Sequence, residues 1–85
     1  MKRANGLLWR DGRQVRAVIQ AKTKKRMVEL VQQVNGNFRM SDLNTYFSMC
    51  WGRPATESIG NDCEEEGVWW TTESDYRDGN YVKVV

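Results

Sequence analysis

The tract from Ser41 to Asn61 constrains the fold of this chain more than any other segment does. Ser41 can cap a helix, and four apolar residues then follow at the spacing of a single helix face. These residues are Leu43, Tyr46, Phe47 and Cys50. Gly52 breaks that helix, and Pro54 suits the first turn of another, because the N–H that proline lacks is unpaired there anyway. The tract therefore predicts two helices joined by a short turn.

A further helix is predicted before this tract. Thr23 can serve as its N-cap, and an apolar stripe follows over three turns. The stripe consists of Met27, Val28, Leu30, Val31 and Val34. We expect this helix to stop at Gly36, which can take the left-handed conformation common just after a helix.

The C-terminal part of the chain predicts a helix followed by a hairpin. The helix that Pro54 opens should cover residues 54–66, with an inward face of small side chains. That face comprises Thr56, Ile59, Gly60 and Cys63. After Gly67 the apolar period changes to two, which predicts strands at residues 68–73 and 80–85 joined by a polar loop.

Two structures compete for residues 1–22. The Asp11-Gly12 pair can form the turn of a small hairpin. Alternatively, Val15, Val18 and Ile19 have the i, i+3, i+4 spacing of a short helix over residues 13–21. Both alternatives stay open, and residues 1–6 are expected to be disordered. We therefore divide the chain into a basic N-terminal extension, residues 1–22, and one domain, residues 23–85.

The residue types present exclude several functions. The chain has no His, which excludes imidazole metal sites and His-based catalysis. Cys50 and Cys63 form no CxxC pair, so we expect core thiols without a metal, and a disulfide between them stays open. No catalytic constellation can be assembled, so we expect neither an enzyme nor a cofactor. The few cysteines and the short apolar runs predict a cytoplasmic protein with no membrane partner.

Charge is spread unevenly along the chain. Residues 1–40 contain ten Lys or Arg and two acids, a net charge of +8, whereas residues 41–85 contain three Lys or Arg and nine acids, a net charge of −6. A basic block of this kind suits phosphate binding through the release of counterions. A solvated face or a self-complementary dimer contact is the alternative explanation.

The order of the predicted elements over residues 23–85 resembles the winged helix-turn-helix superfamily of small bacterial and phage regulators. The resemblance rests on the link at residues 35–40, the Ser41-Asp-Leu start of a helix, the Glu-Glu-Glu-Gly end at Gly67 and the Val68-Trp-Trp strand. It implies an α+β fold with three helices and a C-terminal β-hairpin wing. It also implies that helix 54–66 lies in the major groove of double-stranded DNA.

This resemblance assigns roles to individual residues. The outward positions of the third helix, expected to read bases, are Arg53, Ala55, Glu57, Ser58 and Asn61. The expected phosphate contacts are Lys22, Lys24, Lys25, Arg26, Arg39, Ser41, Arg77 and Lys83. The function expected from these roles is that of a DNA-binding transcriptional regulator, a repressor or accessory factor working as a dimer.

Acidic residues around the third helix support an alternative function. They are Glu57, Asp62, Glu64, Glu65 and Glu66, and phosphates would repel them. Glutamates at the C-terminal end of a helix are also unfavourable to its dipole. A winged helix that docks a basic protein partner, as a phage-encoded inhibitor of a nucleic-acid-handling machine could, is therefore the second hypothesis.

Overall fold

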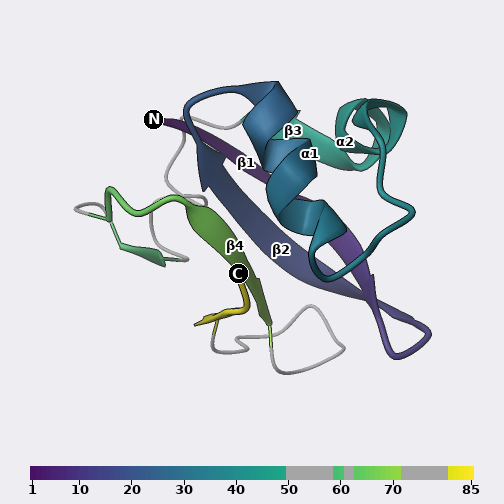
Figure 1. Cartoon of the computed structure of the whole chain (residues 1–85). Helices are drawn as coiled ribbons and strands as arrows, with labels where there is room; N and C mark the ends of the chain where they lie inside the picture. The colour runs from purple at the N-terminus through teal and green to yellow at the C-terminus, as the bar shows by residue number, and fades with distance from the viewer. Residues whose placement is uncertain (50–58, 61–62, 72–80) are drawn as a thin grey trace.

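The computed structural model describes residues 1–49, 59–60, 63–71 and 81–85, which form a five-stranded antiparallel sheet and two helices. The strands lie in the order β3-β1-β2-β4-β5, and α1 crosses one face of the sheet (Figure 1). In chain order the elements are β1 (Lys2–Arg10), β2 (Arg13–Ala21), α1 (Lys24–Gln32), α2 (Met40–Tyr46), β3 (Phe47–Met49), β4 (Gly67–Thr71) and β5 (Tyr81–Lys83).

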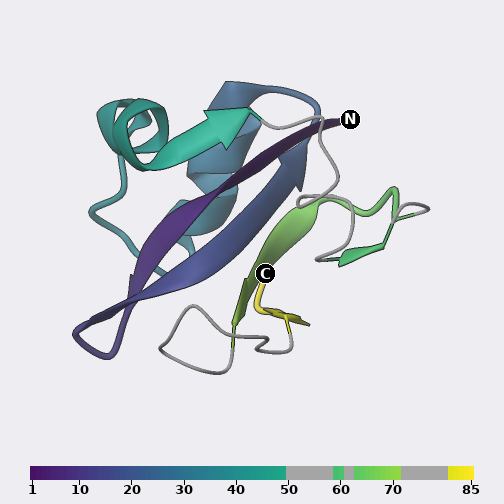
Figure 2. The same ribbon diagram turned by 180° about the vertical axis from the view of Figure 1, so that it is seen from behind.

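This architecture shows that the predicted fold of three helices with a C-terminal wing is wrong. The described residues contain two helices, and strands dominate the structure. Residues 1–22 were expected to be a partly disordered extension, but residues 2–21 form the β1–β2 hairpin at the centre of the sheet (Figure 2). The N-terminal segment therefore shares its core with the rest of the chain.

The β1–β2 hairpin forms because its turn has the right chemistry. Asp11 and Gly12 have φ angles of 50° and 79°, so both occupy the left-handed region that a two-residue hairpin turn requires. Of the two alternatives for this segment, the structure has the hairpin. Nearly every residue from Val15 to Ala21 is buried, so β2 lacks the alternation of a strand with one wet face. That burial explains why a helical spacing fitted the same residues.

Helix α1 confirms the prediction made from Thr23. The Thr23 hydroxyl oxygen accepts a hydrogen bond from the Arg26 N–H at 3.1 Å, as an N-cap does. Four of the five predicted stripe residues form the buried face of α1: Met27, Val28, Leu30 and Val31. The helix ends at Gln32, earlier than predicted, so Val34 lies beyond it and is exposed, and Gly36 does not take the expected left-handed conformation. This face covers β2 and β4.

Helix α2 is shorter than predicted and has a different cap. It begins at Met40, and the backbone N–H of Arg39 donates to Asp42 Oδ2 at 2.9 Å, so Ser41 lies inside the helix rather than capping it. The helix ends at Tyr46, where the chain continues directly into β3 and pairs with Ala4–Gly6 of β1.

Gly6 permits this close approach of β3. A Cβ at Gly6 would collide with the carbonyl oxygen of Tyr46 and would lie 2.6 Å from the ring of Phe47. Tertiary pairing at this point outweighs the helical spacing that predicted a helix through Cys50, which itself lies outside the described residues.

The two C-terminal strands pair antiparallel, close to their predicted positions, but they do not form a separate wing. β4 pairs with β5 on one side and with β2 on the other, so this pair completes one edge of the sheet. Residues 54–58 and 61–62 of the predicted third helix lie outside the described residues. Residues 63–66 are not helical, and Gly60 has a φ of 93°, which no right-handed helix contains. The predicted helix therefore does not reach Glu66.

The main core lies between α1 and the sheet. Its fully buried side chains include Ile19 of β2, Met27 and Val31 of α1, Leu43 of α2 and Val68 of β4. The opposite face of the sheet is also covered in part, because Val18 and Gln20 of β2 are buried although they point away from Ile19.

Candidate nucleic-acid interface

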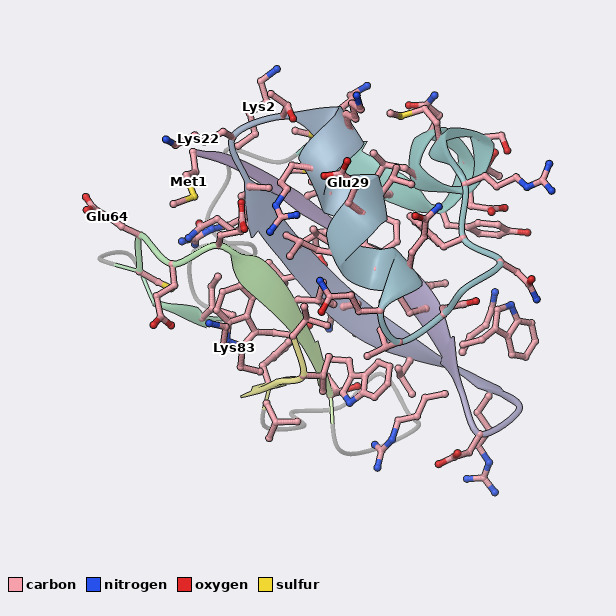
Figure 3. All side chains as sticks on the ribbon, viewed as in Figure 1. Met1, Lys2, Lys22, Glu29, Glu64 and Lys83 are labelled. Atoms are coloured by element: carbon pink, nitrogen blue, oxygen red, sulfur yellow. The ribbon has the colours of Figure 1, made fainter. Side chains whose placement is uncertain are left out.

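Four exposed lysines lie at or next to one end of the sheet. Lys2, in the first pair of the β1–β2 ladder, lies opposite Ala21, and the chain then continues through Lys22 into the first turn of α1. Figure 3 shows Lys2 and Lys22 at the same corner of the molecule. Lys24 and Lys25 open α1 beside them. We call this set, Lys2, Lys22, Lys24 and Lys25, the lysine end.

No ammonium group of the lysine end forms a salt bridge in the described part of the chain, although the charge of Lys22 contributes to the lowered pKa of Glu66. Lys24 Nζ donates to Asn44 Oδ1 at 3.3 Å, which leaves its charge uncompensated. Clustered exposed cations concentrate anions near them and suit a ligand with several phosphates. Three of the four lysines were predicted as phosphate contacts, and Lys2 was missed because only the strand register brings it there.

Arg26, another predicted phosphate contact, is engaged by carboxylates. Its Nε and Nη2 donate to Glu66 Oε1 at 2.9 and 2.8 Å, and its Nη1 lies 3.4 Å from Glu29 Oε1. The hydrogen bond from Arg26 holds the pKa of Glu66 below its ordinary value, although desolvation opposes the shift. Arg26 therefore adds less to the positive field than the four lysines do.

Acid should release this contact. Because the pKa of Glu66 is lower in the folded protein, the pair contributes stability above the ordinary pKa of 4.5, and this contribution is lost as the pH falls through the folded value. We expect Glu66→Gln to lower the free energy of unfolding more at about pH 7 than at about pH 3, measured by urea denaturation. Glu64→Gln, at an exposed neighbour, is the control. An equal loss at both pH values would contradict the assignment.

Three acidic residues of the alternative hypothesis, Glu64, Glu65 and Glu66, lie in the described segment before β4. Glu66 pairs with Arg26, and Glu65 Oε2 lies 3.5 Å from Lys83 Nζ, which also stands 5.7 Å from the centre of the Trp69 ring. Glu64 is exposed. Two of these three acids therefore already have basic partners within the chain, and the predicted phosphate contact Lys83 already has an acidic one.

Two further predicted phosphate contacts belong to α2 and its N-cap. Arg39 and Ser41 lie at the start of α2. There the Asp42 carboxylate accepts a hydrogen bond from the backbone N–H of Arg39, which a phosphate would need, and its charge repels a second anion. The predicted phosphate contact at Ser41 therefore has no support in the structure. Arg53, Ala55, Glu57, Ser58, Asn61, Asp62 and Arg77 lie outside the described residues.

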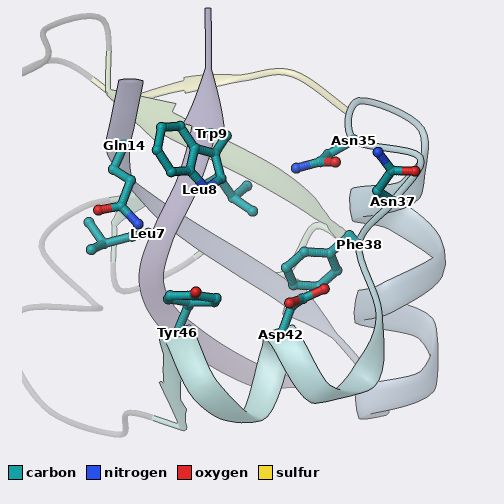
Figure 4. A pocket seen from close by; sticks show the side chains of 9 residues that line it. All are labelled: Leu7, Leu8, Trp9, Gln14, Asn35, Asn37, Phe38, Asp42 and Tyr46. Atoms are coloured by element: carbon teal, nitrogen blue, oxygen red, sulfur yellow. The ribbon is translucent and has the colours of Figure 1, made fainter. Parts of the chain in front are cut away.

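A pocket of about 470 Å³ lies between the hairpin end of β1 and α2 (Figure 4). The indole of Trp9 and the ring of Tyr46 line it although they are 55% and 46% exposed. Polar side chains around it belong to Gln14, Asn35, Asn37 and Asp42, and the buried Leu8 and Phe38 also line it. The sequence did not predict this pocket, because its lining comes from the β1–β2 hairpin and from the distant segment formed by α2 and the link before it. Tyr46 was expected on a buried helix face and is exposed instead.

Neither a cluster of three possible metal ligands nor a helix able to cross a membrane occurs in the ranges that the structure describes. Comparisons of the chain with protein-family models, with curated proteins and with solved structures found no match. The lysine end and the pocket are therefore interpreted from their own geometry and chemistry.

Proposed function

We propose that this protein binds the phosphate backbone of nucleic acid at the lysine end. The observation that carries the proposal is the presence of four exposed lysines at one end of the sheet that form no salt bridge among the described residues, whereas Arg26 and Lys83 do form salt bridges. Each lysine that meets a phosphate releases condensed counterions, which favours binding at low salt. A cytoplasmic location, where nucleic acid is at hand, belongs to the same proposal.

The proposal concerns the backbone and not the reading of a base sequence by a helix. A helix in the major groove needs a continuous reading surface, and residues 63–66 at the end of the expected reading helix are not helical. Binding of a basic protein by the acidic residues is less favoured, because Glu65 and Glu66 contact Lys83 and Arg26 of the same chain.

A fluorescence-polarisation titration of labelled DNA over a salt series tests the proposal. Replacing all four residues of the lysine end by Ala should weaken binding to every sequence alike. It should also make the slope of log K against log salt shallower by about 3, since each backbone contact contributes about 0.7–0.9. Circular dichroism should show an unchanged fold, because all four side chains are exposed.

A single-residue comparison provides the matched control for this experiment. Lys22→Ala and Lys83→Ala remove the same charge, but of the two lysines only Lys83 forms a salt bridge among the described residues. We therefore expect Lys22→Ala to reduce affinity for DNA more than Lys83→Ala does. An unchanged salt slope in the fourfold variant would remove the lysine end from the interface.

A further inference from the structure

We propose that the pocket between β1 and α2 holds one base of a single-stranded nucleic acid, stacked on Trp9 and Tyr46. This inference deepens the proposed function and rests on it for the class of ligand. The lysine end would hold phosphates, and the pocket would distinguish a strand with accessible bases from a duplex.

The aromatic walls of the pocket are the first argument. Trp9 is the most exposed of the large apolar side chains in the described residues, and the half-exposed Tyr46 lines the same pocket from α2 (Figure 4). Neither ring belongs to the hydrophobic core that joins α1 to the sheet. Exposed aromatic faces are the surfaces on which single-stranded nucleic acids stack their bases.

The polar side chains of the pocket are the second argument. Gln14, Asn35 and Asn37 have side-chain amides that make no hydrogen bond in the described part of the chain, so each offers both a donor and an acceptor. Asp42 uses Oδ2 for the Arg39 N–H and leaves Oδ1 for a second donor. Amide and carboxylate groups of this kind match the donor and acceptor edges of bases.

Charge and size decide which part of a nucleotide enters the pocket. The Asp42 carboxylate repels a phosphate, whereas it accepts a hydrogen bond from the amino group of cytosine. The volume of about 470 Å³ lies within the range of about 300–1,000 Å³ found for small-ligand sites. A base therefore suits this pocket better than a phosphate does.

A single strand can reach both sites. β1 runs from Lys2 at the lysine end to Trp9 at the pocket, a separation of about 23 Å at the usual rise of a strand. Stacked nucleotides of one strand advance about 3.4 Å each, so about seven nucleotides cover that distance. An oligonucleotide of about 15 nucleotides is therefore long enough for the test.

The test compares two oligonucleotides of this length that carry the same phosphates. One is oligodeoxycytidine, and the other has abasic sugars throughout. Wild-type protein should bind oligodeoxycytidine about tenfold or more tightly than the abasic strand, in the range that one stacked base contributes. Trp9→Ala and Tyr46→Ala should each reduce this preference, and Trp9→Phe should restore part of it. The lysine-end variant should weaken the binding of both oligonucleotides.

Equal affinity of the wild type for the two oligonucleotides would overturn the inference while leaving backbone binding in place. The binding of cytidine distinguishes this outcome from a failure of the proposed function. Cytidine, which has no phosphate, should shift the NMR signal of the Trp9 indole N–H, and this shift should be lost in Tyr46→Ala. If cytidine shifts the signal but neither oligonucleotide binds, the pocket assignment stands and the proposed function fails. If cytidine leaves the signal unchanged, the pocket assignment is wrong.

Discussion

Replacing Ile19 by Ala is expected to lower the free energy of unfolding by about 2–5 kcal/mol. Ile19 is fully buried in β2, where its register partners are Ala4 of β1 and Val68 of β4, and α1 packs over this part of the sheet. Removing its three outer carbons leaves a cavity that four elements would have to close. The total free energy of unfolding of a small domain is about 5–15 kcal/mol, so the variant should lose a large fraction of its stability and melt at a lower temperature.

Urea denaturation followed by circular dichroism measures this loss. Val82→Ala is the matched control, since Val82 is 40% exposed on the edge strand β5, and surface changes usually stay within about 0.5 kcal/mol. If Ile19→Ala were as mild as Val82→Ala, the central hairpin would not form the core together with α1, and the five-stranded sheet would be incorrect.

The parts of the fold that the sequence predicts correctly are those with local signals. Thr23 caps α1 through its own side chain, and the apolar stripe that follows lies within one helix. The change of period after Gly67 likewise predicts β4. The Asp11-Gly12 pair indicated the hairpin turn that the structure has, as one of two alternatives for that segment. Each of these signals is confined to about ten residues or fewer.

The errors arise where distant parts of the chain decide the structure. β2 is buried on both faces, so its sequence shows no alternation, and the hairpin could not be separated from a short helix. Phe47–Met49 form a strand because Gly6 of β1 lets them approach, which no pattern within residues 41–50 indicates. Once β1 and β2 take the centre of the sheet, the winged arrangement is no longer available to the C-terminal strands.

The candidate interface likewise contains residues that the sequence identifies and residues that only the tertiary fold identifies. Lys22, Lys24 and Lys25 are close in sequence and were identified from it. The pairing of Arg26 with Glu66, 40 residues later, depends on the tertiary fold and offsets part of the charge of one predicted contact. Trp9 and Tyr46 come from different elements, and their exposure could not be inferred from residue type, because aromatic side chains are more often buried than exposed.

The second large effect is expected at Arg3, which joins the sheet to the segment before β4. Arg3 is only 8% exposed, and its guanidinium donates to Gln20 Oε1 at 2.7 Å and to the carbonyl oxygens of Gly60 and Cys63, each at 3.2 Å. Gln20 in turn donates to the carbonyl oxygens of Cys63 and Glu65, at 2.9 and 2.8 Å. The register pair of Arg3 and Gln20 thus fixes this segment to the sheet.

Arg3→Ala should therefore lower the free energy of unfolding by about 3–5 kcal/mol, because hydrogen bonds to a charged group contribute about 1.5–3 kcal/mol each and their buried partners would be left unsatisfied. Arg3→Lys should recover only part of the loss, since one ammonium cannot reproduce the planar fork of the guanidinium.

Lys2→Ala removes the same charge from the adjacent exposed position and should leave stability within about 0.5 kcal/mol of the wild type. Faster hydrogen exchange at the amides of residues 63–66 in Arg3→Ala alone would locate the damage in this segment. If Arg3→Ala proved as mild as Lys2→Ala, these carbonyl contacts would not hold the segment on the sheet.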